Sequence, residues 1–343
     1  MKKLLFAISS VFMLFVIGCK SNAFETLKIE HQWGIPTFTV NFIEGLYNNQ
    51  IYTLTMQKGV GYDLSFYSLS GTLQKNIYFK FGQGPSEFKT TPSAMAINDD
   101  GIFVFFYSLN IIKKFNLSGI YIDEYVINKE REFNPFFPEI QLNNGTIYYH
   151  NIGNDYLGIS TIEGKTMRRI PHTVEIDTTR KKWLYQGGML KYDTYTNQMY
   201  VGRYAALLTI EIYDDQLNLV GEIHDKQIKA KELFIVTSGK YSNPEGDFVL
   251  NDIDYDEDYI YVTTGVSLDW NNDASPKETS TTNCIIAYDK LKKKFFKKYW
   301  NPNLKPNNFG YFIVGTTSDY IVVSSMGAQD NSNNKETFYV LKK

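Results

Sequence analysis

Cysteine is scarce in this chain: among 343 residues there are two, Cys19 and Cys284. Cys19 lies in an N-terminal segment that we interpret below as an export signal with lipidation at that residue, which leaves no pair for an intramolecular disulfide. Cys284 stands in the apolar segment Cys284–Tyr288 with no histidine or lysine directly beside it. We therefore expect a buried, unreactive thiol at Cys284 rather than a nucleophile.

Histidine is also rare, and the formal net charge is only −2. The four histidines match no zinc-binding spacing; they are His31, His150, His172 and His224. The chain lacks a Gly-x-Ser-x-Gly motif and a Ser/His/Asp signature as well. A mildly acidic chain has no electrostatic affinity for nucleic acid, so we expect no nucleic-acid partner. We also expect no cofactor and no bound metal.

Long apolar runs and helical periodicity are missing too. The N-terminal run Leu4–Ile17 is too short for a membrane-spanning helix, which takes about 20 residues. With Lys2-Lys3 before it, the run fits a secretory signal, and Gly18-Cys19 after it resembles a bacterial lipobox. We predict a lipoprotein signal peptide over residues 1–18, a tether over 19–26 lipidated at Cys19, and one domain over 27–343. The only possible short helix is Asp225–Val236.

Turn and strand patterns, by contrast, recur along the whole chain. Two or three polar residues, mostly Asn and Asp, precede an apolar residue and then aromatic or β-branched residues, the order expected at a hairpin corner followed by a strand. The first apolar residue falls at Ile51, Ile102, Ile147, Met199, Ile260 and Ile321, in steps of 51, 45, 52, 61 and 61 residues. Repeats of roughly 40 to 50 residues, each worth about four strands, are typical of propeller blades.

The pattern predicts an all-β fold, a six-bladed β-propeller of four-stranded antiparallel blades. The last repeat supplies only three strands, ending at Thr337–Leu341, while the N-terminal region supplies two before the first turn, near Ile29 and at Thr37–Val40. We assign the segment at Thr37–Val40 to blade one. The strand near Ile29 then completes the last blade and closes the ring, because an unpaired edge would invite aggregation.

One repeat carries a family resemblance. The residues Phe81-Gly82, Gly84, Glu87-Phe88 and Gly101–Val104 resemble an NHL-type repeat, and Gly84–Phe88 is similar to a loop of six-bladed propeller lipoproteins of the Bacteroidetes type. The chain departs from the pattern at Ser86, where many relatives have glycine, and at Phe106, where NHL repeats have aspartate. The resemblance implies a six-bladed ring and says little about activity, because such rings serve many functions.

Two segments resemble ligand sites, but a purely structural role explains each of them better. Gly82 and Gly84 do not open a helix, so a phosphate-binding loop is not indicated. The acidic run Asp252–Asp258 lacks the glycine and the final glutamate of a calcium loop and coincides with a recurrent turn. Asp252 and Asp254 alternate and would lie on one face of an inner strand, so carboxylate ligands near the propeller axis stay open as an alternative.

Long loops give the candidate binding site. The loops on the face that carries the blade-to-blade connections include 176–187 and 267–283, which are predicted to hold two tryptophans and several polar residues. We assign ligand binding to Trp183, Trp270, Arg180, Lys182 and Tyr185. The alternative is that these are exposed loops without a ligand.

We interpret the chain as an extracytoplasmic, lipid-anchored propeller that acts as a binding or scaffold module for a glycan or peptide, and we favour this reading over an enzyme. Its partners would be the membrane, through the N-terminal lipid, and an outer-membrane protein of an uptake system. The location would be the cell envelope, on the outer membrane, with the side left open. The alternative function is a propeller hydrolase or lyase with a metal near the central channel.

Overall fold

A computed structural model describes the chain in segments. They are residues 25–36, 42–57, 59–126, 139–151, 156–162, 165–171, 188–203, 208–225, 234–238, 241–247, 250–264, 267–268, 284–299, 311–325 and 335–343. Every statement below concerns these residues. The signal segment and Cys19 lie outside them. No helix within them is long and apolar enough to cross a membrane.

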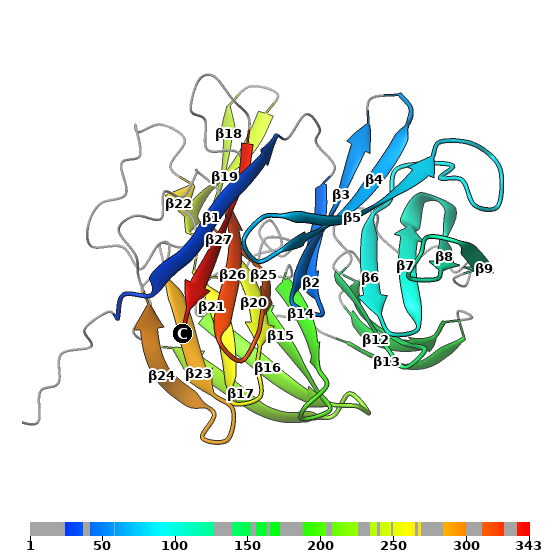
Figure 1. Cartoon of the computed structure of the whole chain (residues 1–343). Coiled ribbons are helices and arrows are strands. Elements are labelled where there is room, and N and C mark those ends of the chain that lie inside the picture. Colours follow the sequence, from blue (N-terminus) through cyan, green and yellow to red (C-terminus); the bar gives the residue numbers. More distant parts are fainter. Residues whose placement is uncertain are drawn as a thin grey trace, which may run out of the picture.

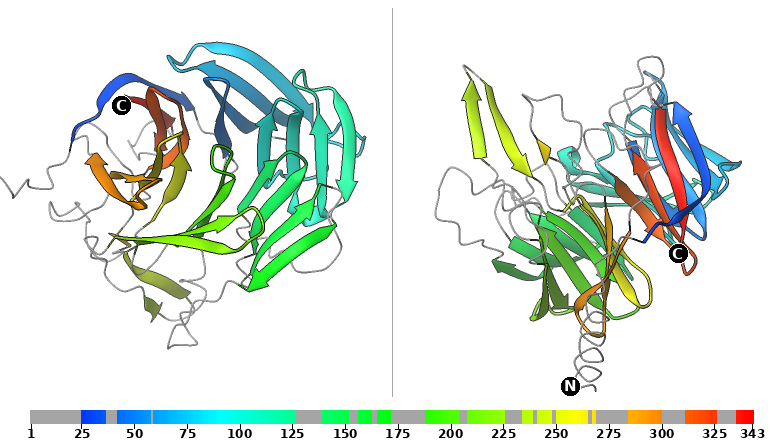
Figure 2. Two further views of the ribbon diagram at one scale, coloured as in Figure 1. Left: turned by 90° about the horizontal axis from the view of Figure 1, so that it is seen from below. Right: turned by 90° about the vertical axis from the view of Figure 1, so that its left-hand side faces the viewer.

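Six four-stranded antiparallel sheets form a ring, which is the predicted β-propeller (Figure 1 and, from below, Figure 2). Blades 1 to 3 follow one another along the chain. They comprise β2 (Phe42–Tyr47), β3 (Gln50–Gln57), β4 (Gly61–Ser68), β5 (Leu73–Lys80); β6 (Ala94–Asn98), β7 (Gly101–Phe106), β8 (Ile111–Phe115), β9 (Tyr121–Val126); and β10 (Glu139–Asn143), β11 (Thr146–Asn151), β12 (Tyr156–Thr161), β13 (Thr166–Pro171).

Blades 4 to 6 repeat the same order of strands, with one exception in the last blade. They comprise β14 (Gly188–Asp193), β15 (Gln198–Arg203), β16 (Leu208–Asp214), β17 (Leu219–Asp225); β20 (Asp252–Tyr255), β21 (Tyr259–Thr263), β23 (Ile285–Asp289), β24 (Lys294–Tyr299); and β25 (Phe312–Thr316), β26 (Tyr320–Ser325), β27 (Lys335–Lys342), β1 (Lys28–Pro36). Blade 6 therefore takes its outer strand from the N-terminus, as predicted.

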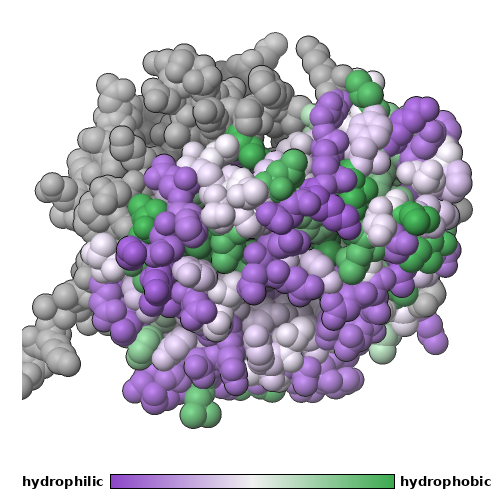
Figure 3. All heavy atoms as spheres, viewed as in Figure 1, coloured by the Kyte–Doolittle hydropathy of each residue, from purple (hydrophilic) through white to green (hydrophobic). Residues whose placement is uncertain are grey.

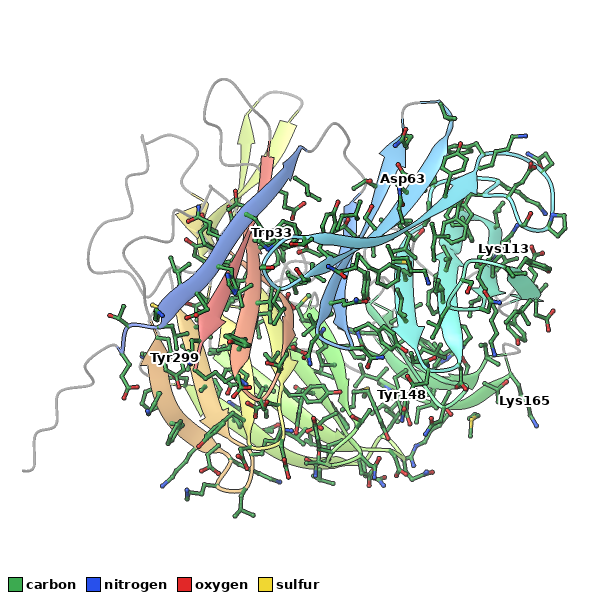
Figure 4. The ribbon with its side chains drawn as sticks, in the orientation of Figure 1. Trp33, Asp63, Lys113, Tyr148, Lys165 and Tyr299 are labelled. Carbon is green, nitrogen blue, oxygen red and sulfur yellow. The ribbon has the colours of Figure 1, made fainter. Side chains whose placement is uncertain are left out.

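The closing strand β1 contacts both neighbouring blades, through its pairing with β27 of blade 6 and through Trp33 on blade 1. β1 pairs with β27 from Lys28 opposite Lys342 to Pro36 opposite Lys335. Trp33 of β1, labelled in Figure 4, stacks on Phe338 with ring centroids 4.5 Å apart. Its indole nitrogen donates a hydrogen bond to the carbonyl oxygen of Leu69, in the β4–β5 turn of blade 1 (3.2 Å). One side chain thus joins the last blade to the first.

The core of the ring consists of six apolar layers among the described residues, one at each junction between successive blades. The layer between blades 1 and 2 is largely aromatic and includes Phe79, Phe88, Phe106 and Phe115, all at most 2% exposed. The abundance of Phe and Tyr therefore serves blade-to-blade packing, because each blade buries both faces of its sheet against its neighbours.

Two local expectations are wrong. The inner strand of blade 1 is β2, which begins at Phe42 rather than near Thr37. Its sequence contains Glu44 and Gly45 and so lacks the apolar character that singled out the earlier segment. The possible helix Asp225–Val236 is wrong at both ends: Asp225 belongs to β17, and the last residues belong to β18 (Phe234–Ser238), which pairs with β19 (Tyr241–Asp247). Residues 226–233 lie outside the described residues.

A further small sheet lies outside the six blades. β18, β19 and β22 (Ser267–Leu268) form a three-stranded sheet, and the β18–β19 hairpin projects from the ring in Figures 1 and 2. The hairpin is inserted in the sequence between β17, the outer strand of blade 4, and β20, the inner strand of blade 5.

On the visible face of the molecule, apolar residues form small separate groups among hydrophilic ones (Figure 3).

Candidate functional site

The loop residues assigned to ligand binding cannot be placed. Arg180, Lys182, Trp183, Tyr185 and Trp270 all lie outside the described residues. Their assignment stays a prediction. The described neighbours of the two loops are β14, which begins just after 176–187, and β22, which ends at Leu268.

The structure reveals instead a group of charged residues contributed by strands around the axis. We call it the axial cluster; its members are Glu44, Lys191, Asp252, Asp254 and Glu336. Glu44, Lys191 and the two aspartates belong to inner strands of blades 1, 4 and 5, and Glu336 belongs to β27 of blade 6. The members interact in series: Lys191 with Asp254 and Asp252, Asp252 with Glu44, and Glu44 with Glu336.

Strand geometry explains how β20 contributes two members. Side chains alternate along a strand, so Asp252 and Asp254 share one face while Ile253 points to the other. Ile253 is fully buried in the layer between blades 4 and 5. The two aspartates therefore face blade 6, where Asp252 accepts a hydrogen bond from the backbone nitrogen of Ile313 (2.8 Å). The prediction that both carboxyls lie on one face of an inner strand is confirmed.

Burial changes the protonation of these aspartates. Asp252 is 5% exposed and Asp254 8% exposed. Burial raises the pKa of Asp252 to about 6, although Lys191 and two backbone donors act in the opposite direction. Burial also raises the pKa of Asp254, against the influence of Lys191. Both carboxyls are thus weaker acids than aspartates in water.

Lys191 is the cation of the cluster. Its ammonium nitrogen lies 3.7 Å from Oδ1 of Asp254. Burial disfavours the ammonium, but Asp254 and Asp252 together outweigh burial and raise the pKa of Lys191 above its ordinary value. The Lys191 and Asp254 side chains keep 23% and 12% of their surface exposed. The cluster is therefore not sealed from solvent.

Glu44 and Glu336 form a pair of carboxyls at the junction of blades 1 and 6. Ser324 donates a hydrogen bond to Oε1 of Glu44. Oε2 of Glu44 and Oε1 of Glu336 are buried without a hydrogen-bond partner among the described residues. Burial, and then the charge of Glu336, raises the pKa of Glu44 well above its usual range. Burial raises the pKa of Glu336 to about 7. The pair can hold one proton between two carboxyls near neutral pH.

Tyr52 lies beside this pair on β3 and is 7% exposed. Its hydroxyl occupies the space above Gly45: a Cβ added there would stand 2.2 Å from the hydroxyl oxygen. Burial raises the pKa of Tyr52 to about 12. Tyr52 is therefore a neutral phenol, close enough to Lys191 and Glu44 for both charges to act on it.

Stability should fall as the pH rises through the carboxyl pair. The pKa of Glu336 is about 7 in the folded chain, against an ordinary value of 4.5. Since the folded state binds this proton more tightly, Glu336 contributes about 3 kcal/mol to the free energy of unfolding below about pH 4, and this contribution is lost as the pH rises through 7. The change Glu336→Gln keeps a donor for Glu44 and removes the charge. The variant should then be more stable than wild type at about pH 8, measured as the urea midpoint.

A matched control is Glu257→Gln in the β20–β21 turn, where the side chain is exposed. This change should alter neither the midpoint nor its pH dependence. In the Glu336→Gln variant, Asp252, with a pKa of about 6, still makes the unfolding free energy depend on pH at lower pH. A Glu336→Gln variant with the wild-type slope between about pH 6 and 8 would show that the pair is not the titrating group.

Other singled-out residues have structural roles. Asp256 accepts hydrogen bonds from the backbone of Asp258 (2.9 Å) and Tyr259 (2.8 Å), so the acidic run is a turn, as interpreted. Cys284 is 2% exposed, and burial raises its pKa to about 11, which suits an unreactive thiol. In the part of the chain that is described, no three His, Cys, Asp or Glu side chains are grouped to hold a metal ion.

A second charged group, on the turn between β14 and β15, is fully satisfied. Asp193 is buried, pairs with Lys290, and accepts a hydrogen bond from the hydroxyl of Tyr200 (2.7 Å). The Lys290 ammonium also lies over the ring of Tyr255 (4.9 Å). Because every partner is already engaged, this group holds the turn of blade 4 against blade 5 and is not a ligand site.

Comparison with known proteins identifies the fold alone. No family model and no curated relative matches the chain. Among solved structures it is similar to a member of the DUF4221 family from Bacteroides vulgatus, with a TM-score of 0.59 and 13% identity over 92% of this chain and 97% of that one. It is also similar to a candidate exported protein from Bacteroides fragilis, with a TM-score of 0.51 and 11% identity over 94% and 95%. These identities are too low to carry a function across.

The cluster escaped sequence reasoning except for Asp252 and Asp254. Glu44, Lys191 and Glu336 are far apart in the chain, and only ring closure brings them together. One signal was available: Glu44, Lys191 and Asp252 each stand a few residues before a recurrent turn, which places them on inner strands. Charged residues at that position of a blade point to the axis.

Proposed function

We propose that the chain is a lipid-anchored, extracytoplasmic binding module whose ligand places an ammonium group at the axial cluster. The observation that carries the proposal is the excess of carboxyl groups over cations there. Among the described residues, Glu44 and Glu336 each have a buried oxygen whose one possible partner is the other carboxyl, when the two share a proton. A ligand N–H group would satisfy such an oxygen, and burial of the acceptor strengthens the interaction.

The ligand class is a glycan or a peptide that bears a free amine. Its remainder would lie over the connection face, where the loops with Trp183 and Trp270 begin and end. Stacking on each tryptophan would contribute about 1 to 3 kcal/mol. Arg180 or Lys182 would meet an acidic group of the ligand, and Tyr185 would add a hydrogen bond.

The location follows from the predicted signal and lipobox. Acylation of Cys19 would hold the protein at the outer membrane, alongside an outer-membrane protein of an uptake system. The similarity to a candidate exported protein of Bacteroides fragilis supports an extracytoplasmic location.

Paired probes that differ only in N-acetylation test the ligand chemistry. Chitosan and chitin oligosaccharides, and lysine and acetyl-lysine peptides, form two such pairs. The wild type should prefer the free amine at least about tenfold, because a buried charge-assisted hydrogen bond is worth about 1.5 to 3 kcal/mol. The double change Glu44→Gln and Asp254→Asn should abolish this preference. Equal binding of both members of each pair would contradict the ammonium assignment.

A second variant tests the loops separately. Replacing Trp183 and Trp270 by alanine should weaken binding of the preferred probe about tenfold or more, with the melting temperature nearly unchanged. A double variant that melts much lower would show that these tryptophans pack in the core. Normal folding with normal binding would place the ligand elsewhere.

The alternative, a hydrolase or lyase at the same place, is favoured by one observation. Glu336 has a pKa of about 7, which suits a group that donates and accepts a proton during catalysis. Turnover of one of these probes, lost in Glu336→Gln, would support it. Elemental analysis that finds one tightly held ion per chain would favour the metal-dependent form of this alternative.

A further inference from the structure

An exposed patch of apolar and basic residues lies along the outer edge of blades 4 and 5. Its apolar members protrude strongly: Leu291 is 91% exposed, Leu219 51%, Val220 42% and Phe296 39%. The β23–β24 turn and β24 add Lys292, Lys293 and Lys294. The Lys293 ammonium donates to the carbonyl oxygen of Val220 (3.0 Å), which joins the two blades. We call these seven residues the edge patch.

The chain enters the fold beside this patch. The backbone nitrogen of Glu25 donates to the carbonyl oxygen of Lys298 on β24 (2.9 Å), and the Glu25 carboxylate pairs with Lys297 (2.9 Å). Figure 1 shows the start of β1 next to β24 at the edge of the ring. Since a strand rises about 3.4 Å per residue, Lys294 lies about 17 Å from Tyr299, the bridge partner of Glu25.

Chain length fixes how far a lipid at Cys19 can be. Six peptide units separate Cys19 from Glu25, and a fully extended chain covers at most about 20 Å over that length. A folded chain of this size has a radius of gyration of about 20 Å and is thus more than twice as wide as the tether is long. The membrane must therefore lie against the side of the ring from which Glu25 leaves.

We propose that the edge patch rests on the surface of the bilayer that holds the lipid anchor. The inference rests on the proposed acylation of Cys19. Apolar side chains flanked by lysines suit the boundary between acyl chains and anionic headgroups. The ring then stands on its edge, and the connection face with its loops stays open to ligands. Exposed apolar residues on blade 2, such as Ile122 (51% exposed), lie across the ring and do not touch lipid.

Fluorescence of the full-length acylated protein in vesicles tests this orientation. Cys19 is acylated and Cys284 is buried, so a nitrobenzoxadiazole label attaches only to an engineered cysteine. Label on Leu291→Cys should be quenched by headgroup spin-labelled lipid in vesicles of phosphatidylcholine and phosphatidylglycerol. Label on Ile122→Cys, the matched control, should not be quenched. Adding Lys292→Gln and Lys294→Gln should lower the docked-to-undocked ratio about fivefold for each lysine.

Two results would overturn the inference: equal quenching at both positions, or none at Leu291→Cys. Metabolic labelling with a fatty-acid analogue separates this failure from failure of the anchor. The wild type should incorporate the analogue and Cys19→Ser should not. Equal incorporation by both would remove the anchor itself, and with it the geometric basis of the edge patch.

Discussion

Deleting β1 should leave the chain unable to form a stable ring. Removal of Lys28–Pro36 takes away every hydrogen bond of the β1–β27 ladder and exposes β27 as an unprotected edge. It also uncovers Phe338, which is fully buried. The combined loss exceeds the typical net stability of a domain, about 5 to 15 kcal/mol. The deleted protein should aggregate or show no cooperative melting transition.

Single substitutions at Trp33 test the contact that closes the ring without removing any of strand β1. Trp33→Ala should destabilise the fold by about 3 kcal/mol, because it removes the stack on Phe338 and the contact with Tyr67. Trp33→Phe keeps an aromatic side chain for the stack on Phe338 but loses the donor to Leu69 and part of the indole, so it should cost about 1 kcal/mol or somewhat more, and less than Trp33→Ala. Calorimetry of both variants checks this order. A deleted protein that melts like the wild type would mean that β1 does not hold the ring closed.

Replacing Lys113 by methionine should cost about 2 to 4 kcal/mol of unfolding free energy. The change removes a buried ammonium group and leaves the carbonyl oxygens that it binds without a hydrogen-bond donor. Lys113 is completely buried (labelled in Figure 4). Its ammonium donates to the carbonyl oxygens of Gly84 (3.3 Å), Pro85 (2.8 Å) and Glu87 (2.6 Å). These bonds hold the loop that directs Phe88 into the layer between blades 1 and 2. Burial lowers the pKa of Lys113.

The neighbouring residue supplies the control. Lys114 is partly exposed and lies over the ring of Phe103 (5.2 Å), without bonds to the loop. Lys114→Met should change the unfolding free energy by no more than about 0.5 kcal/mol. Urea unfolding of the two variants measures the difference. Equal destabilisation by both would show that the loop does not depend on the buried ammonium.

Much of the fold could be predicted because its signals are local. Asn49, Asn144 and Asn197 adopt positive φ at blade turns, as the turn chemistry required. In blade 2 the strand Gly101–Phe106 begins one residue before Ile102, the first apolar residue after the predicted turn, because its fully buried residues form a continuous apolar run. The family-like segment Gly84–Phe88 proved to be a connection between blades, locked by a lysine.

The axial cluster and the extra sheet could not be predicted, because neither has a local signal strong enough. Glu44 and Glu336 are 292 residues apart and meet only through the closing blade. Their pKa values depend on burial and on each other, which no short window of sequence contains. The β18–β19 hairpin contains Pro244, a residue that normally argues against a strand.

The attachment of Glu25 to β24 has a mechanical consequence. A force that pulls the protein away from the proposed lipid anchor at Cys19 would enter the fold at the N-terminal end of β1, the strand that closes the ring. Before that force reaches the β1–β27 ladder, it must break the backbone bond from Glu25 to Lys298 and the ion pair with Lys297. These two contacts act as a clamp that takes the first load. A brief pulling force on a bound ligand would therefore break the contacts of Glu25, which can form again, before it opened the ring.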